Sequence, residues 1–302
     1  MLIINKKVQD ALRQNQAVVA LESTIISHGM PYPTNVKVAL EVESTINKTG
    51  AIAATIGIID GDIIVGMTHE QIEEFGSRQG IVKVSGRDLA YVTSKKLWGS
   101  TTVAATMIIA KMAGIDVFVT GGIGGVHRGA ELTYDVSNDL DELSKTRLIV
   151  VCAGPKAILD VEKTVEYLET KGVPLVGYQT DTLPLFYTRT SDINVPIRLD
   201  TPQDIAKLYV CQAEMELRPS VLVANPISEE DSVDHVKMDQ WIKESLTKAK
   251  ALGIKGKEET PFLLKKIVEL SGGESLEANT KLIINNAKLG AEIALSLAKE
   301  RR

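Results

Sequence analysis

One lysine follows an apolar run and a Gly-Pro turn, in the segment Arg-Leu-Ile-Val-Val-Cys-Ala-Gly-Pro-Lys that ends at Lys156. A lysine at the mouth of a buried strand can lose its proton, because desolvation or a neighbouring cation destabilises an ammonium group. The neutral amine is a nucleophile that forms a Schiff base with a sugar carbonyl. The alternative is an exposed lysine at the start of the helix that follows, and the position alone favours that alternative.

A carboxylate ends the first apolar run, where Glu22 follows Val-Val-Ala-Leu. A carboxylate at the end of a buried strand is costly unless it is paired or protonated. Glu22 is therefore a candidate general acid or base, although it could instead cap nearby backbone amides. His28 lies a few residues further on, but a single histidine beside Gly and Pro is more often a hydrogen-bonded loop anchor.

A glycine-rich turn, Thr-Gly-Gly-Ile-Gly-Gly-Val-His-Arg, runs from Thr120 to Arg128. Its backbone amides could approach an anion, so a sugar phosphate could bind there with His127 or Arg128. A tight turn for close packing explains the glycines equally well. The third glycine of a dinucleotide motif is replaced by His127, and the only Gly-Lys pair, Gly256-Lys257, is followed by glutamate rather than Ser or Thr. Nucleotide cofactors are therefore not supported.

Two acids four residues apart, Asp135 and Asp139, enclose Val136, Ser137 and Asn138. Oxygen ligands of this kind suit a hard divalent ion or a ribose. A calcium loop is excluded because the sequence has leucine where that loop needs glycine. The alternative is structural, since Asn138 or Asp139 could cap the helix that follows.

Two further segments could hold a phosphate. Lys83 and Arg87 follow a short apolar run, and Ser100 to Val103, which includes Thr102, opens a nearly apolar helix whose free N–H groups attract anions. Either segment could equally be a helix cap or a solvated surface. The segment from Ser271 to Asn279 leads into the long last helix and puts an amide, that of Asn279, where it could fold back over a pocket.

The elements that must position these residues alternate between apolar runs and amphipathic helices, which predicts a three-layer α/β/α sandwich with a mixed, largely parallel sheet. Ligands then bind at the carboxyl ends of strands, in the loops after Leu21, Thr120, Cys152 and Ala224. We expect strands at 18–21, 52–59, 63–65, 82–84, 117–120, 148–152, 175–178 and 221–224. An Asp-Gly-Asp turn at 60–62 predicts an antiparallel hairpin.

Helices are expected between the strands, at 35–48, 101–112, 160–170 and 202–216. After the acidic, linker-like stretch 226–234 the strand signal stops, and helices are expected near 236–252, 261–271 and 275–300. We therefore expect one domain over residues 1–302 with a helical C-terminal part at about 234–302.

The bulk composition excludes several classes of protein. The 302 residues carry a formal net charge of −5 without a long basic run, which argues against a nucleic-acid or anionic-membrane partner. The N-terminus has no signal-peptide pattern, and no apolar run reaches the roughly 18 residues of a membrane span. Cys152 and Cys211 lie in apolar segments, so we expect two buried free thiols and a cytoplasmic location.

Taken together, six segments resemble the indigoidine synthase A-like family of pseudouridine-5′-phosphate glycosidases, and the resemblance covers nearly the whole chain in order. The segments are 20–31, 120–131, 151–156, 177–180, 224–226 and 260–264. This chain has Pro155 where the family motif has alanine. The resemblance implies cleavage of the carbon–carbon glycosidic bond of pseudouridine 5′-phosphate to uracil and ribose 5-phosphate, a divalent metal, typically Mn²⁺, and a homotrimer.

The resemblance also implies roles for individual residues. Lys156 would be the nucleophile, Glu22 the proton donor and Asp135 the metal ligand. The other pocket and substrate-binding residues would be Lys83, Thr102, Val103, Thr120, His127, Ser137, Asn138, Asp139 and Asn279. Two other classes stay open: a different Schiff-base lyase, such as an aldolase acting on another sugar phosphate, and a non-catalytic sugar-phosphate-binding protein.

Overall fold

A mixed sheet of eleven strands runs through the computed structural model, which describes residues 1–254 and 256–301. The strands are β1 (Leu2–Ile4), β2 (Val18–Leu21), β3 (Ile52–Ile59), β4 (Asp62–Val65), β5 (Val82–Val84), β6 (Gly99–Thr101), β7 (Val117–Val119), β8 (Ile149–Cys152), β9 (Leu175–Tyr178), β10 (Ile197–Leu199) and β11 (Val221–Ala224). Their order is β1-β4-β3-β2-β7-β8-β11-β9-β10, and β6 joins β5 to β3. Only β4 and β6 pair antiparallel, both with β3, so the sheet is largely parallel as predicted.

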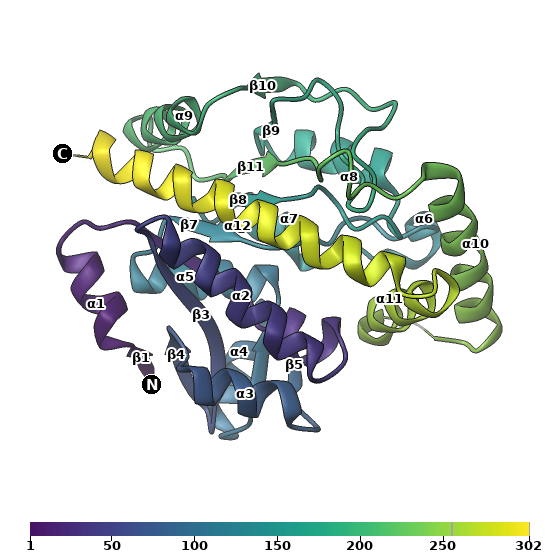
Figure 1. Ribbon diagram of the computed structural model, residues 1–302, viewed down its shortest axis with the longest axis horizontal. Helices are drawn as coiled ribbons and strands as arrows, with labels where there is room; N and C mark the ends of the chain where they lie inside the picture. The colour runs from purple at the N-terminus through teal and green to yellow at the C-terminus, as the bar shows by residue number, and fades with distance from the viewer. Residues whose placement is uncertain (255, 302) are drawn as a thin grey trace.

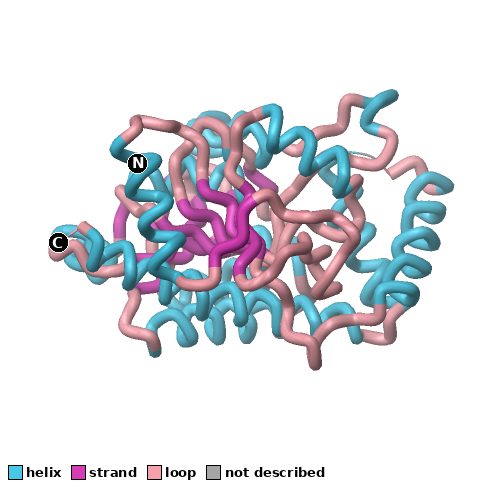
Figure 2. The backbone as a smooth tube through the Cα atoms, turned by 90° about the horizontal axis from the view of Figure 1, so that it is seen from above, coloured by secondary structure: helices cyan, strands magenta, loops and turns pink. Residues whose placement is uncertain are grey.

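Helices cover both faces of this sheet (Figure 1). They are α1 (Lys6–Arg13), α2 (Thr34–Lys48), α3 (His69–Ser77), α4 (Leu89–Ser94), α5 (Val103–Ala113), α6 (Ala130–Thr133), α7 (Asn138–Leu143), α8 (Val161–Thr170), α9 (Pro202–Glu214), α10 (His235–Ala251), α11 (Glu259–Leu270) and α12 (Glu274–Glu300). One π-helical turn, η1 (Ile25–Gly29), and two 3₁₀ turns, η2 (Gly86–Asp88) and η3 (Gly256–Glu258), lie between them. Seen from above, the strands lie between two layers of helix (Figure 2).

Alternation along the central strands separates the two large clusters of the core, because successive side chains of a strand point to opposite faces. Val19 and Leu21 of β2 pack in the cluster that also holds α2, α9 and α12, whereas Val18 and Ala20 pack in the cluster that holds α5. All four residues are buried. This is why the strand reads as a continuous apolar run, as expected for a parallel strand covered on both faces.

Five predicted strands, 18–21, 52–59, 82–84, 175–178 and 221–224, have the bounds observed for β2, β3, β5, β9 and β11. The hairpin between β3 and β4 is antiparallel, and Asp60 and Gly61 in its turn both have positive φ, 50° and 82°. Three short strands, β1, β6 and β10, were missed. Thr101, which was placed in a helix, ends strand β6 instead, and its hydroxyl donates to the carbonyl of Ile56 in β3.

The last helix, α12, lies across the sheet and is the longest of the described helices (Figure 1). Small residues on its buried face allow a close approach to β7. A Cβ atom at Gly290 would overlap the Cγ2 atom of Val119. At the far end of the helix, Arg301 donates to a carboxylate oxygen of Asp116 at 2.6 Å, next to the start of β7.

Replacing Gly290 with alanine is therefore expected to destabilise the fold. Overpacking of this kind typically costs about 1–3 kcal/mol, which exceeds the roughly 1 kcal/mol that alanine gains over glycine in a helix. Urea unfolding followed by circular dichroism measures the change. Lys288→Ala is the control, because Lys288 is an exposed residue of the same helix. An unfolding midpoint for Gly290→Ala equal to that of the wild type would contradict the packing described here.

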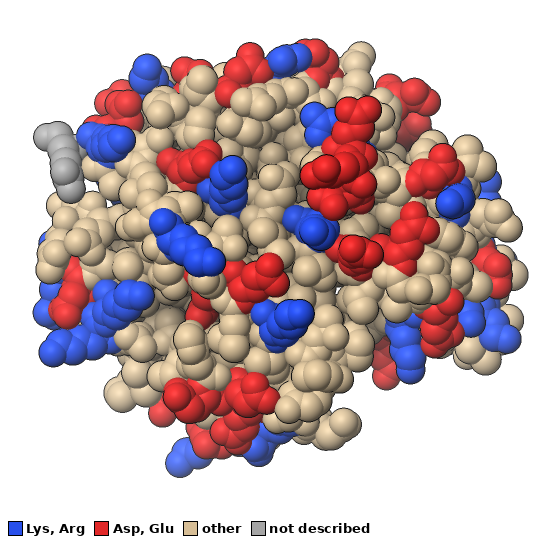
Figure 3. Space-filling view, in the orientation of Figure 1, with Lys and Arg blue, Asp and Glu red and all other residues tan. Residues whose placement is uncertain are grey.

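The expectation of two buried thiols was wrong for one of them. Cys152 is buried at the end of β8, but Cys211 is exposed on α9, since it lies on the face of that helix that points away from the sheet. None of the described helices combines the length and apolar character needed to cross a bilayer. Basic and acidic side chains are interspersed on the face shown in Figure 3.

Candidate active site

A cavity of about 630 Å³ opens where β2, β7 and β8 end. All twelve residues to which the family resemblance gives a role line it, although they lie up to 257 positions apart in the chain, from residue 22 to residue 279. These residues are Glu22, Lys83, Thr102, Val103, Thr120, His127, Asp135, Ser137, Asn138, Asp139, Lys156 and Asn279. Arg128, the alternative phosphate ligand, is exposed and is not among the described residues that line the cavity.

Glu22 is the first residue after β2 and is buried, with 9% of its surface exposed. The hydroxyls of Thr24 and Thr120 each donate to one of its carboxylate oxygens. The π-helical turn η1 begins three residues later, and such turns are common at functional sites because they redirect side chains. The partners of this carboxylate are thus side-chain hydroxyls, rather than the backbone amides that a purely capping role would use.

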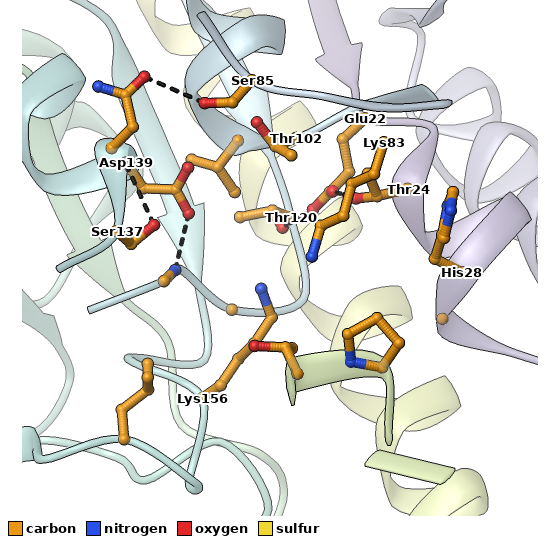
Figure 4. A pocket seen from close by; sticks show the side chains of 18 of the residues that line it. Glu22, Thr24, His28, Lys83, Ser85, Thr102, Thr120, Ser137, Asp139 and Lys156 are labelled. Carbon is orange, nitrogen blue, oxygen red and sulfur yellow. Dashed lines mark hydrogen bonds between the residues drawn. The ribbon is translucent and has the colours of Figure 1, made fainter. Parts of the chain in front are cut away.

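Lys156 follows β8 through a turn in which Gly154 has φ 89°. Its backbone N–H donates to the carbonyl of Ile123 at 3.1 Å, which ties the turn to the glycine-rich loop. The side chain is half-buried and points into the cavity, toward the space that the Lys83 side chain also enters (Figure 4). The next helix, α8, begins only at Val161, so Lys156 is not an exposed lysine at a helix start.

His28 lies at the edge of the same cavity, on η1. Burial, and to a lesser extent the positive charge of Lys83, lower the pKa of His28 below its ordinary value of 6.5. Its Nδ1 atom lies 2.6 Å from the hydroxyl of Ser27 and 3.2 Å from that of Ser100. At neutral pH His28 is therefore an uncharged hydrogen-bonding group, held by two hydroxyls, rather than a cation.

Asp139 is buried and accepts hydrogen bonds from two backbone amides of different segments. One carboxylate oxygen accepts from the N–H of Ala104 at 3.0 Å, at the start of α5, and the other from the N–H of Gly124 at 2.9 Å (Figure 4). A Cβ atom at Gly124 would lie 2.7 Å from this carboxylate. Asp139 therefore joins α5 to the glycine-rich loop.

Several backbone N–H groups of the glycine-rich loop donate hydrogen bonds to other groups of the protein. Besides Gly124, the N–H of Ile123 donates to the carbonyl of Gly154 and the N–H of Val126 donates to the hydroxyl of Thr164. These bonds favour close packing, rather than anion binding, as the reason for the glycines. The helix after the loop is capped by Ser137, whose hydroxyl accepts from the N–H of Asp139, and not by Asn138 or Asp139.

Three potential metal ligands meet at one side of the cavity. One ligand atom each from His127, Asp135 and Glu259 lie within 4.8 Å of one another. The Nδ1 atom of His127 is 3.6 Å from a carboxylate oxygen of Glu259. An imidazole and two carboxylates form a donor set that suits Mn²⁺ or another divalent first-row metal. Because both oxygens of Asp139 are bonded to amides, Asp135 is the better placed of the two aspartates to hold an ion.

Sequence reasoning missed Glu259 and Phe186. Glu259 directly precedes the segment 260–264, whose Thr260 and Pro261 line the cavity. The family resemblance of that segment could have drawn attention to Glu259. Phe186 also lines the cavity and is buried, although φ is 61° at this residue, which is rare for a bulky side chain. No pattern in the sequence marks Phe186.

Asn279, at the start of α12, is buried and reaches the cavity wall. Its Oδ1 atom has no hydrogen-bond partner within the described part of the chain. Buried polar atoms are normally paired, so this amide oxygen is an exception at the wall of the cavity.

Comparisons with known proteins agree over almost the whole chain. A family model described as indigoidine synthase A like protein matches residues 7–296. A pseudouridine-5′-phosphate glycosidase of Petrotoga mobilis is 55% identical over 293 residues, which cover 97% of this chain and 96% of that protein. The enzyme of the same name from Escherichia coli (strain K12) is 54% identical over 296 residues, which cover 97% of this chain and 95% of that protein.

Two solved structures share the fold. The crystal structure of the prealnumycin C-glycosynthase AlnA in complex with ribulose 5-phosphate matches with a TM-score of 0.92 and 38% identity, and covers 100% of this chain and 98% of that one. An indigoidine synthase A-like protein from Thermotoga maritima matches with a TM-score of 0.91 and 37% identity, and covers 99% of this chain and 97% of that one.

Proposed function

Since this chain belongs to the indigoidine synthase A-like family, we propose that it is an enzyme that cleaves pseudouridine 5′-phosphate to uracil and ribose 5-phosphate. The relatives that share half of its residues over nearly their whole length are named for this activity. AlnA, named as a C-glycosynthase, was crystallised with a pentose phosphate, and its fold is the same.

The observation that carries the proposal is the placement of Lys156 and Glu22 in one cavity. Its volume of about 630 Å³ suits a nucleotide-sized ligand, since small-molecule sites commonly measure about 300–1,000 Å³. The cavity offers an amine, a buried carboxyl group, a neutral histidine and an unpaired amide oxygen. This combination fits a reaction that needs a nucleophile and a proton donor.

The chemistry differs from that of ordinary glycosidases. Those enzymes protonate an oxygen or nitrogen leaving group between two carboxylates. In pseudouridine the leaving atom is a carbon of uracil, C5, which has no lone pair to protonate. A route in which an amine nitrogen holds the electrons of the breaking bond avoids this difficulty.

In the proposed route, Glu22 in its acid form donates its proton to the ribose ring oxygen, and the bond from that oxygen to C1′ breaks. The neutral amine of Lys156 bonds to C1′, and the proton that its nitrogen then loses returns to Glu22. The bond from C1′ to C5 breaks next. Its electron pair goes to C5, which takes the proton from Glu22, while the nitrogen lone pair forms a C1′–nitrogen double bond.

Hydrolysis of this iminium closes the cycle. Water adds its oxygen to C1′ and gives one proton to Glu22, which restores the acid. The second proton of that water moves to the nitrogen as the bond from C1′ to Lys156 breaks. The lysine leaves as the neutral amine, and the aldehyde released is ribose 5-phosphate. Glu22 and Lys156 thus end in the protonation states in which they began.

A divalent metal such as Mn²⁺ fits the donor set of His127, Asp135 and Glu259. When bound, such an ion would supply positive charge that offsets negative charge on the substrate. Asp135 and Glu259 are half-buried, and their mutual repulsion without a cation would favour binding one. Ser137 and Asn138 lie beside this group on the cavity wall, where they can bind substrate oxygens.

Replacing Glu259 with glutamine is expected to weaken Mn²⁺ binding by at least about 10- to 100-fold. Loss of a residue that only hydrogen-bonds a metal ligand already costs this much, so loss of a ligand should cost no less. Isothermal titration with Mn²⁺ alone measures this without activity. Glu258→Gln is the matched control, because Glu258 is the neighbouring acid and is exposed. Equal affinities for the two variants would show that Glu259 is not a ligand.

We further propose that the protein is a cytoplasmic homotrimer, as the family resemblance implies. Leu132 and Tyr134 support an interface, since 85% and 88% of their surfaces are exposed and both are apolar. They lie in and next to α6, close in sequence to Asp135. Light scattering coupled to gel filtration gives the oligomeric state directly, and a monomer would contradict this part of the proposal.

The function is tested by incubation with pseudouridine 5′-phosphate, with uracil and ribose 5-phosphate quantified after separation. Both products should appear in equal amounts. Uridine 5′-phosphate, in which the sugar is bonded to nitrogen, is the control substrate. Binding of pseudouridine 5′-phosphate without product would indicate a binding protein, and the absence of both binding and product would point to another sugar-phosphate lyase.

A further inference from the structure

A pair of asparagines lies beneath the cavity and outside its lining. Asn286 is wholly buried in the middle of α12. Its Nδ2 atom donates to the carbonyl of Thr120 at 2.9 Å and to that of Gly121 at 3.3 Å. Its Oδ1 atom accepts from Nδ2 of Asn225 at 3.0 Å. A buried amide is costly unless it is bonded, and here both of its donors and its acceptor are used.

Asn225 fixes the orientation of the Asn286 amide. If the amide were reversed, its oxygen would face the carbonyls of Thr120 and Gly121, and its nitrogen would face the Nδ2 of Asn225. Asn225 is itself held at the end of β11, because its backbone N–H donates to the carbonyl of Cys152 at 2.8 Å. The pair therefore links α12 to the carboxyl ends of β7, β8 and β11.

The residue at the other end of this chain of bonds is Glu22. The carbonyl of Thr120 accepts from Asn286, and the hydroxyl of the same Thr120 donates to Glu22. Along the sheet, Thr120 is held by its own N–H, which donates to the carbonyl of Val151 at 3.0 Å. Asn286 adds a bond from the helix layer, so the backbone that carries the Thr120 hydroxyl is held from two directions.

We propose that Asn286, oriented by Asn225, is a positioning residue that holds Thr120 so that its hydroxyl fixes the Glu22 carboxyl group for proton transfer. The inference rests on the proposed function, because it assigns Asn286 a role in the step that uses Glu22. Neither asparagine lines the cavity, so their effect reaches the reaction only through the residues that they hold. Misplacing a catalytic group by about 1 Å can cost about 100-fold in rate.

The first test compares Asn286→Asp with Asn285→Asp. Both change an asparagine of α12 that donates to a backbone carbonyl, but Asn285 donates to Pro226 at 3.0 Å and not to Thr120. We expect Asn286→Asp to lower kcat about 10- to 100-fold with KM within about threefold, because substrate-binding groups stay in place. Asn285→Asp should leave both constants within about twofold of the wild type.

The decisive test is a double-mutant cycle with Thr120→Val, which removes the hydroxyl that reaches Glu22. If Asn286 acts through Thr120, Asn286→Asp lowers kcat in the wild type but costs less than about twofold more in the Thr120→Val background. A merely structural role would give the same factor in both backgrounds. Equal factors, or equal losses for the variants at positions 285 and 286, would overturn the inference.

A second variant keeps the test decisive if Asn286→Asp does not fold, as judged by circular dichroism. Asn225→Ala leaves Asn286 in place and removes only the bond that orients its amide. It should lower kcat about threefold, and this loss should also disappear in the Thr120→Val background. Wild-type turnover of pseudouridine 5′-phosphate is measured first. No uracil from the wild type contradicts the proposed function and the inference together, whereas normal turnover with multiplicative losses contradicts the inference alone.

Discussion

Replacement of Lys156 by alanine is expected to lower the rate of uracil release by at least about 10⁴-fold, the scale on which enzymes that use a covalent nucleophile lose activity without it. The loss should appear in kcat, because the alanine variant keeps the hydroxyl, amide and carboxylate groups that line the rest of the cavity. Lys156→Arg should be equally inactive, since a guanidinium keeps the positive charge but cannot form a Schiff base.

Borohydride gives this prediction its chemical readout. Added during turnover, it should reduce the iminium and leave a ribose-phosphate mass on the peptide that contains Lys156. Lys145→Ala is the control, because Lys145 is an exposed lysine shortly before β8, at the opposite end of that strand from Lys156. This variant should react at the wild-type rate and give the same adduct.

A competing site for the adduct is Lys83, since its side chain also enters the cavity among the residues that the structure describes (Figure 4). A mass increase on the peptide that contains Lys83, together with normal turnover in Lys156→Ala, would show that Lys156 is not the nucleophile. Because the two lysines are 73 positions apart in the chain, a single protease digestion separates their peptides.

Replacement of Glu22 by glutamine is expected to lower kcat by about 10²- to 10⁴-fold, the usual contribution of general acid–base catalysis. The amide keeps the size of the side chain but cannot give a proton to the ring oxygen. Glu43→Gln is a matched control. Glu43 is also a buried glutamate that accepts from a threonine hydroxyl, that of Thr55 at 2.5 Å, but it lies outside the cavity.

Glu43 should tolerate the change because burial raises its pKa, despite opposing contributions from Thr55, His69 and Lys7. A raised pKa means that burial makes the charged form of Glu43 less favourable than it is in water, so an uncharged amide of the same size should be tolerated. We expect Glu43→Gln to retain kcat within about threefold of the wild type. If Glu43→Gln lowered kcat as much as Glu22→Gln, the loss in the Glu22 variant would reflect the removal of a buried carboxyl group in general, and would not identify Glu22 as the proton donor.

Trapping separates the two roles further. Ribose 5-phosphate opens to its aldehyde in solution, so Glu22→Gln should still give a borohydride adduct at Lys156 from that compound. From pseudouridine 5′-phosphate, whose ring must first be opened by the acid, the same variant should give almost none. Equal trapping from both compounds would show that Glu22 does not act in ring opening.

The sequence predicts the position of the site better than it predicts the connections that build it. The four loops expected to carry ligands, after Leu21, Thr120, Cys152 and Ala224, do follow four adjacent strands, β2, β7, β8 and β11. Each strand is a continuous apolar run with a polar or charged residue within four positions of its end, which is a local signal. The order of the strands in the sheet is not local, because it depends on which helices pack on which face.

The missed features have the same physical origin. Strand β6 is Gly-Ser-Thr and has no apolar residue. Strands β1 and β10 end the order of strands in the sheet and contain no fully buried residue, so burial imposes little pattern on their sequences. Glu259 joins His127 and Asp135 only because α11 packs over the cavity, and the two sequence regions share no pattern. Asp139 was expected to bind substrate, and it does line the cavity. Its hydrogen bonds to the amides of Ala104 and Gly124 were not predicted, because they depend on a contact between α7, α5 and the glycine-rich loop.

The spread of the site along the chain has a consequence for refolding. Glu22, Thr120, Lys156 and Asn279 meet only after β2, β7, β8 and α12 have assembled, and contacts between residues so distant in sequence form slowly because long loops must close first. Helical signal can return early after dilution from denaturant, whereas turnover requires the last long-range contact. Catalytic activity should thus lag behind the ellipticity, and no half of the polypeptide should recover it unaided.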